Sequence, residues 1–206
     1  MSKNPLAPKP SVKREAIIDA AQKAFLDVGY AATAMDSVAL GAGVSKATIY
    51  AHFESKDQLF AAVMRRRCDS SFVFTPPDES ADARTALTCI AQRLMALLTS
   101  PDALALYRVV VAEATRAPDL ARAFYETGPV RAKASIAATV ERLKARGDLN
   151  KTVDALTFTD QLIGMLRAET YNRALLGLPQ GRGMEQTITD AVETLLQAYG
   201  TKEEEK

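Results

Sequence analysis

Hydrophobic residues recur at intervals of three and four along most of the chain, which is the spacing of one face of an α-helix. The first such stretch begins near Ser11 and stops at Gly29, and its apolar positions are Ile17, Ala20, Ala21, Ala24, Phe25 and Val28. We find no alternation of apolar and polar residues long enough to predict a β-strand. The pattern therefore predicts an all-α protein with about nine helices.

Amphipathic stretches also fill the second part of the chain, and glycines and prolines separate them. Gly128 and Pro129 predict a break or kink, whereas Gly147 and Gly177 predict helix ends. The segment Thr75-Pro76-Pro77-Asp78 is the clearest boundary in the sequence. The helices predicted here cover residues 56–68, 81–100, 101–116, 119–127 with a continuation to 146, 153–176 and 184–199.

Residues 33–60 predict two short helices joined by a tight turn, with a third helix leaving from Ser55. Thr33 is the predicted N-cap of the first helix, and Ser45 is that of the second. Gly43 suits the left-handed conformation that closes the first helix. A helix, a turn of about four residues and a second helix form the helix-turn-helix pattern, whose second helix enters the major groove of DNA.

The residues expected to face DNA lie on and beside this second helix. Lys46 is the best candidate for a base contact, because the first residues of such a helix reach deepest into the groove and lysine donates to guanine O6 and N7. Thr33 and Ser45 are expected to bind phosphates through their hydroxyls, and Ala47 to touch a thymine methyl group. The predicted DNA-binding set is Thr33, Ser45, Lys46, Ala47, Thr48, Tyr50, His52 and Lys56.

The segments IIDAAQKAFLDVGY and TAMDSVALGAGVSKATIYAHFESKDQLF resemble the N-terminal domain of TetR/AcrR-type transcriptional regulators. The resemblance covers about the first third of the chain. It implies that Tyr50, His52 and Lys56 hold the DNA backbone. We therefore predict a three-helix DNA-binding domain over residues 1–56, with a disordered tail or basic arm at 1–10, and a helical ligand-binding and dimerisation domain over residues 57–206.

This resemblance implies a ligand-responsive repressor that binds a pseudo-palindromic operator as a homodimer and is released by a small-molecule effector. At helical spacing, however, the residues assigned to the effector and to the dimer are equally explained as the core of a single chain. The predicted pocket consists of Met95, Tyr107, Val111, Phe124, Phe158 and Met165, and the predicted dimer contacts are Leu162, Leu166, Ile188 and Leu195.

Composition limits the other possibilities. The chain has 206 residues, 48% of them hydrophobic, and its net charge of +1 is too small to indicate nucleic-acid binding by itself. Its single histidine and two separated cysteines lack the spacing of a metal site, so we predict no metal, no cofactor and no enzyme activity. No apolar run approaches the roughly 18 residues of a membrane span, so we expect a cytoplasmic protein with no membrane partner.

The sequence leaves an alternative function and two roles of an arginine triplet open. A helical sensor or adaptor could use the same fold to bind a protein partner. A steep loss of DNA affinity with rising salt concentration would indicate a DNA-binding regulator instead. The triplet Arg65-Arg66-Arg67 either complements the dipole at a helix C-terminus or contacts DNA.

Overall fold

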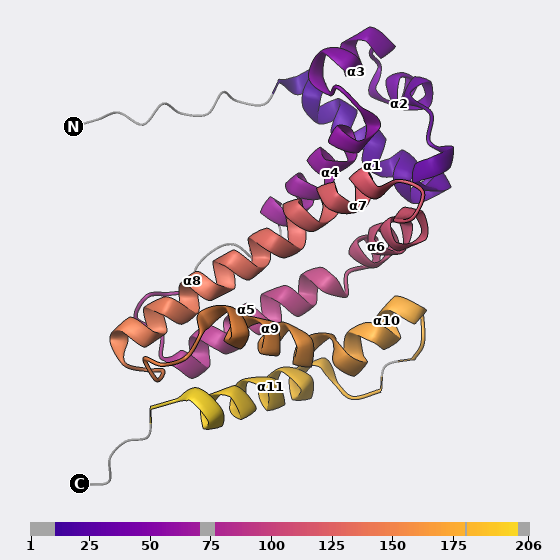
Figure 1. Cartoon of the computed structure of the whole chain (residues 1–206). Coiled ribbons are helices and arrows are strands. Elements are labelled where there is room, and N and C mark those ends of the chain that lie inside the picture. Colours follow the sequence, from indigo (N-terminus) through magenta and orange to yellow (C-terminus); the bar gives the residue numbers. More distant parts are fainter. Residues whose placement is uncertain (1–10, 71–76, 180, 202–206) are drawn as a thin grey trace, which may run out of the picture.

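The chain folds into helices joined by short loops, as the computed structural model shows for residues 11–70, 77–179 and 181–201 (Figure 1). The predicted tail at 1–10 and part of the predicted boundary at 75–78 lie outside these residues. The α-helical segments are α1 Val12–Ala32, α2 Met35–Ala42, α3 Lys46–His52, α4 Lys56–Ser70, α5 Ala83–Leu98, α6 Pro101–Glu113, α7 Pro118–Tyr125, α8 Arg131–Arg146, α9 Ala155–Leu166, α10 Asn172–Leu176 and α11 Met184–Tyr199.

Two π-helical turns join four of these segments into two continuous rods. The turn η1, Glu126–Val130, connects α7 to α8, and η2, Arg167–Tyr171, connects α9 to α10. The described residues therefore form nine helices, which confirms the all-α prediction. The chain does not break at Gly128 and Pro129, because Pro129 lies inside η1, where the wider hydrogen-bonding pattern accommodates a residue without an N–H group. The alternative prediction, a kink at this point, remains a prediction.

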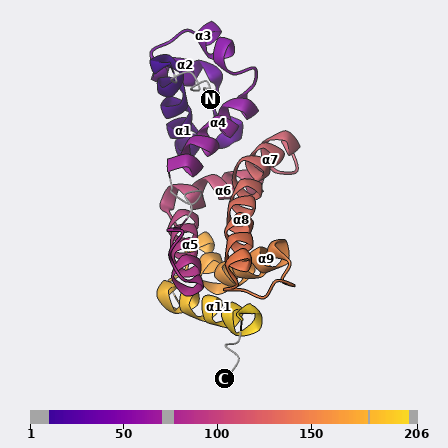
Figure 2. The same ribbon diagram turned by 90° about the vertical axis from the view of Figure 1, so that its left-hand side faces the viewer.

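Helices α1 to α4 gather at one end of the molecule, and α11 lies near the other end (Figures 1 and 2). The rod formed by α7, η1 and α8 runs between these two ends. Helix α11 packs against α5 and α9, and α4 packs against α1, α7 and η1. The chain is thus elongated, with α4, α6 and the α7 rod connecting its two ends.

Buried side chains form two hydrophobic clusters, which we name the N-terminal core and the C-terminal core. The N-terminal core holds Phe25, Ile49 and Phe60 from the first four helices, and also Leu106 of α6 and Leu120 of α7. The C-terminal core consists of residues from α5, α8, α9 and α11 with their connecting loops. Helix α4 therefore packs with the first three helices, while the division at residue 56 remains a prediction.

Glycines in the left-handed conformation end the helices where the sequence predicts it. Gly147 closes α8 with φ 87°, and Gly177 closes α10 with φ 68°. Gly29 has φ 81° and interrupts α1 three residues before its end. These backbone conformations favour glycine because it has no Cβ.

In the described ranges, no single helix combines the length and hydrophobicity that crossing a membrane requires, although α5 and α6, bent by 66°, meet that test as a pair. The same ranges contain no group of three His, Cys, Asp or Glu side chains placed to hold a metal ion.

Candidate nucleic-acid interface

The turn between α2 and α3 is closed by Gly43, as predicted. Its φ of 65° lets the amides of Gly43 and Val44 donate to the carbonyl oxygens of Leu40 at 3.2 Å and of Ala39 at 3.0 Å. Gly41 lies within α2, where an added Cβ would stand 3.4 Å from the Ala20 Cβ of α1. This close approach fixes α2 against α1, and the turn then sets the direction of α3.

Helix α3 is anchored on one side and capped at its start. Ile49 is fully buried and Phe53, just after the helix, is nearly so. The Ser45 hydroxyl accepts from the Thr48 amide at 3.1 Å and lies 2.8 Å from the Thr48 hydroxyl, which confirms Ser45 as the predicted N-cap. A short helix of seven residues is held in this way by its inner face and its cap.

The opposite side of α3 is open to solvent. Tyr50 is 47% exposed, the Lys46 side chain is 51% exposed, and Ala47 and His52 are also exposed. Ser45 is exposed at the start of the helix, whereas Thr48 is half-buried. The structure thus brings six of the eight predicted DNA-binding residues onto or beside one short helix.

Lys46 has a partner on the neighbouring helix. Its ammonium donates to the Asp36 carboxylate at 2.9 Å, and this hydrogen bond raises the pKa of Lys46. Asp36 belongs to the first turn of α2, and its side chain is 70% exposed. Both groups therefore lie on the outer surface of the helix-turn-helix.

Thr33 does not occupy the predicted position. The N-cap of α2 is Ala34, which has no side-chain cap, and Thr33 is only 3% exposed. Its hydroxyl donates to the Gly29 carbonyl oxygen at 2.6 Å, because the bend at Gly29 turns that carbonyl toward it. Thr33 thus closes α1, and the prediction that its hydroxyl caps α2 is wrong. The predicted phosphate contact of Thr33 remains a prediction.

Lys56 is engaged inside the protein at the junction of α1 and α4. Its ammonium donates to the Thr33 carbonyl at 2.9 Å and to the Ala31 carbonyl at 3.4 Å, and lies 4.4 Å from the centre of the Tyr30 ring. Burial lowers the pKa of Lys56. The predicted phosphate contact of Lys56 remains a prediction. Its contacts with Tyr30 and the two carbonyls were not predicted, because these partners lie 23 to 26 positions away in the sequence.

Tyr30 is fixed on its other side by Asp57, which accepts a hydrogen bond from the Tyr30 hydroxyl. Burial, together with this hydrogen bond, raises the pKa of Tyr30 above its ordinary value. The Tyr30 ring also contacts Phe25 and Phe60, with centroid distances of 5.6 Å and 5.7 Å. The end of α1, just before α2 begins, is therefore held by a side-chain hydrogen bond and by contacts between aromatic rings.

The arginine triplet connects α4 to other helices. Arg66 donates to Asp19 of α1 at 2.6 Å, while Arg67 donates to Asp102 of α6 at 2.9 Å and to Ser100 at 2.7 Å. Arg67 lies in the last turn of α4, which ends at Ser70, so it occupies a position where a cation complements the helix dipole. Arg66 and Arg67 also form ion pairs with neighbouring helices, and a contact of the triplet with DNA remains a prediction.

The predicted effector pocket is divided by the structure. Met95 and Phe158 are fully buried in the C-terminal core, Met165 packs against it, and Val111 is 58% exposed on α6. Tyr107 and Phe124 lie together outside that core, with ring centroids 5.6 Å apart. The six residues therefore do not line one common pocket.

Tyr107 belongs to a cluster that also contains Tyr171 and Arg167 of η2. The Arg167 guanidinium carbon lies 4.7 Å from the Tyr171 ring centre and 5.7 Å from that of Tyr107, and its N–H donates to the Tyr107 hydroxyl at 3.4 Å. Burial raises the pKa of Tyr171. Arg167 was not predicted from the sequence, because no local spacing relates it to Tyr107 on another helix.

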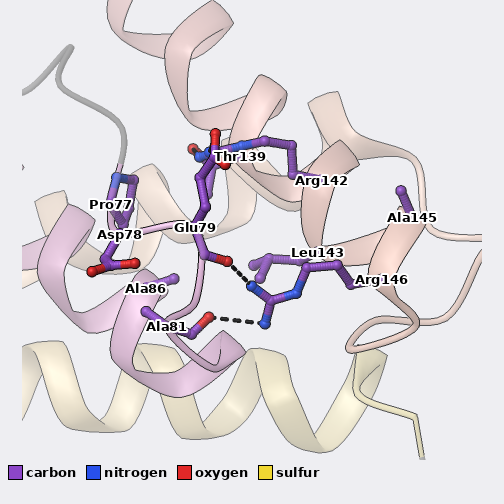
Figure 3. Close-up of a pocket in the computed structure, with 10 residues that line it drawn as sticks. All are labelled: Pro77, Asp78, Glu79, Ala81, Ala86, Thr139, Arg142, Leu143, Ala145 and Arg146. Carbon is purple, nitrogen blue, oxygen red and sulfur yellow. Dashed lines mark hydrogen bonds and ion pairs between the residues drawn. The ribbon is translucent and has the colours of Figure 1, made fainter.

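A cavity of about 320 Å³ lies at the opposite end of the C-terminal core, between α5, α8 and the loop that precedes α5 (Figure 3). Arg146 donates there to the Glu79 carbonyl and, at 2.9 Å, to the Ala81 carbonyl. Ala86 and Leu143 form part of its apolar wall. None of the predicted pocket residues lines this cavity.

The four predicted dimer residues are all buried within one chain. Leu162 and Leu166 of α9, and Ile188 and Leu195 of α11, belong to the C-terminal core. The prediction that these side chains contact a second copy is wrong, because the inner faces of α9 and α11 pack against each other and against α5. Any dimer contact through these helices has to use their outer faces.

A short capped helix with an accessible outer face, mounted on a helical body, defines a helix-turn-helix DNA-binding protein. Residues 17–63 match the model of the bacterial regulatory proteins of the tetR family, and residues 85–201 match the C-terminal domain of AefR-like transcriptional repressors. The chain therefore belongs to the TetR family and is a DNA-binding transcriptional regulator.

Similar proteins agree with this assignment. A TetR-family regulator of Mesorhizobium loti has 34% identity and a TM-score of 0.80, with 92% of this chain and 97% of that chain covered. The flavonoid-responsive regulator FrrA also has 34% identity, with a TM-score of 0.79 and coverage of 93% and 98%. The transcriptional activator FasR of Mycolicibacterium smegmatis is 45% identical over 58 residues, which are 28% of this chain and 26% of FasR. This chain thus spans about a quarter of the length of FasR.

Proposed function

We propose that this regulator is a ligand-responsive repressor that binds a pseudo-palindromic operator as a homodimer. The observation that carries the proposal is the outer face of α3, where Lys46 and Tyr50 are exposed while Ile49 is anchored below them. A face of this kind is free to enter the major groove without rearrangement of the domain. Repression is supported by the match of residues 85–201 to AefR-like repressors, whereas the match to the activator FasR covers a much shorter stretch.

Lys46 is the residue we assign to the base contact. It is the first residue of α3, and its ammonium has three N–H donors, of which Asp36 accepts one. Guanine presents two acceptors, O6 and N7, at the floor of the major groove. Tyr50 and His52, further along the exposed face, are assigned to the DNA backbone.

The exposed face of α3 is too short to contact a full operator by itself, which supports binding as a dimer. One short helix covers only a few base pairs, and two copies related by a two-fold axis place their helices about 34–36 Å apart, one turn of DNA. We assign the dimer contact to the outer faces of the α9 rod and α11. The exposed stripe on this rod is Thr157, Gln161, Gly164 and Ala168, whose side chains are mostly small and allow a second helix to approach closely.

The effector is assigned to the cluster of Tyr107, Phe124, Tyr171 and Arg167. Aromatic rings and a guanidinium plane favour a planar aromatic compound with an acidic or phenolic oxygen. The name of FrrA, a flavonoid-responsive regulator, points to the same class of compound. Helix α6 carries Tyr107 and also places Leu106 in the N-terminal core, so a ligand that displaces α6 acts on the packing of α1 and α4.

Release of the operator is then a shift between two populations of the dimer. The ligand favours the population whose α3 helices no longer match adjacent major grooves. A footprint on the DNA beside the gene that encodes this chain, with and without a flavonoid, tests the scheme. We expect a protected pseudo-palindrome that the flavonoid exposes again. Protection that stays unchanged at saturating ligand, or a single unpaired half-site, contradicts it.

A further inference from the structure

The helix-turn-helix contains a single pair of opposite charges. Between Thr33 and Phe53 the only acidic residue is Asp36 and the only residue with a formal positive charge is Lys46. They are ten positions apart, yet their side chains meet at 2.9 Å across the turn. This unit, residues 33–53, therefore has no net formal charge at the surface that approaches DNA.

Asp36 compensates for an unfavourable position of Lys46. Lys46 is the first residue of α3, where the positive end of the helix dipole repels a cation. The first turn of α3 holds no acidic residue of its own, and the nearest carboxylate is supplied by the first turn of α2. The pair thus holds the ammonium in place above the start of the recognition helix.

Lys46 can readily exchange Asp36 for another acceptor. The side chains are 51% and 70% exposed, and ion pairs between exposed groups are weak because water screens them. A phosphate that approached Lys46 from outside would meet the Asp36 carboxylate as well, and two anions repel each other. A guanine edge presents neutral acceptors and meets no such repulsion.

We propose that Asp36 is a specificity-determining residue, which positions Lys46 and withholds its charge from the phosphate backbone so that a base edge is the favoured acceptor. This inference rests on the base contact proposed for Lys46. Asp36 thereby lowers affinity for DNA in general and raises the ratio of operator binding to random binding. The contribution of Asp36 comes from its negative charge, so a glutamate at position 36 should have the same effect.

The test compares Asp36→Asn with Glu141→Gln in the full-length chain. Glu141 on α8 has an exposed side chain and forms an ion pair with Lys144, also at 2.9 Å, and each variant removes one negative charge and one such pair. Helix α8 runs away from the end of the molecule that holds α3 (Figure 1), and residue 141 belongs to the C-terminal half of α8. Thermal melts are recorded first to check that both variants are folded. Binding is measured on the duplex that the wild-type protein enriches from a random pool, and on a random duplex of equal length, over a range of salt concentrations.

We expect Asp36→Asn to bind the random duplex about three- to tenfold more tightly, with a salt slope steeper by about one for each protomer bound and so by about two for the proposed dimer, because each Lys46 is then free to replace a counterion. Binding to the enriched duplex changes less, so the specificity ratio falls. Asp36→Glu keeps the wild-type slope. An Asp36→Asn variant that behaves like Glu141→Gln on both duplexes overturns the inference.

Lys46→Ala separates this inference from the proposed function. Weaker binding of Lys46→Ala to the enriched duplex, together with no difference between Asp36→Asn and Glu141→Gln, overturns the role of Asp36 alone. Unchanged binding by Lys46→Ala overturns the base contact and the role of Asp36 with it. In the Lys46→Ala background, we expect Asp36→Asn to lose its effect on the salt slope.

Discussion

The ammonium of Lys56 lies 4.4 Å from the centre of the Tyr30 ring while it donates to the Thr33 carbonyl at 2.9 Å. This relationship joins the start of α4 to the end of α1, immediately before α2 begins. It gives Lys56 a structural task in the domain that presents α3. The effect of removing the Lys56 side chain on the stability of the domain can therefore be measured without DNA.

We expect Lys56→Ala to lower the free energy of unfolding by about 1–2 kcal/mol, because it removes a charged hydrogen bond and a cation–π contact. Denaturant titration measures this loss. Lys23→Ala is the matched control, since Lys23 forms only an exposed ion pair with Asp27 on its own helix. DNA binding by Lys56→Ala should weaken similarly on all sequences. A loss of binding with unchanged stability would instead favour a direct phosphate contact.

Tyr30 makes stability depend on pH above about 10. Its pKa is raised in the folded protein, so the folded state retains a proton that an unfolded tyrosine gives up near pH 10. The stabilisation is fully present below that pH and is lost as the pH rises further. Tyr30→Phe should show a smaller fall in the free energy of unfolding between pH 9.5 and roughly 11.5. Equal falls in both proteins would contradict the role of the hydroxyl.

Gly43→Ala tests the turn that aims α3. No atom lies within 4 Å of an added Cβ, so the cost comes from the backbone φ of 65° alone and should reach about 1 kcal/mol. Gly183 also has open space around its Cβ but a φ of −62°, so Gly183→Ala costs only the poorer capping of α11 by alanine, about 0.5 kcal/mol. The difference between the two melting curves checks the assignment. Equal costs would mean that the turn tolerates a right-handed conformation.

Lys46→Ala should weaken binding to the enriched duplex about tenfold and relax the preference at one base pair, since it removes one base contact. Sequencing the duplexes that the variant selects from a random pool reveals which position has lost its preference. Lys151→Ala removes the same charge from an exposed lysine in the loop between α8 and α9, outside the predicted DNA-binding set, and should leave that position unchanged. Selection of the same sequence by Lys46→Ala would show that another residue reads this base pair.

Arg167→Met should preserve operator binding and reduce the affinity for a hydroxylated flavonoid at least tenfold, because it removes the charge between the Tyr107 and Tyr171 rings. Calorimetry measures the ligand, and gel shift measures the operator. Arg93→Met on α5 is an arginine control outside this cluster. Full flavonoid affinity in the Arg167 variant would place the effector elsewhere in the C-terminal domain.

Local signals in the sequence were enough for α3. The Ser45 cap, the left-handed Gly43 and the inward Ile49 all act within a few residues, so their physical chemistry is readable from spacing alone. Thr33 was assigned wrongly because the bend at Gly29 offered its hydroxyl a nearer acceptor at the end of α1. Pairs such as Lys56 with Tyr30 escaped prediction because only the packing of α1 against α4 brings them together.

The sequence by itself determined the helix-turn-helix, the all-α architecture and the resemblance to the TetR family. It did not determine which chain the apolar stripes of α9 and α11 face, because an amphipathic helix has the same pattern whether it packs on its own core or on another copy. The tertiary structure decided that Leu162 and Ile188 fill the core of a single chain. It also decided that Asp36 meets Lys46, because a contact between side chains ten residues apart depends on how the turn folds α3 back beside α2.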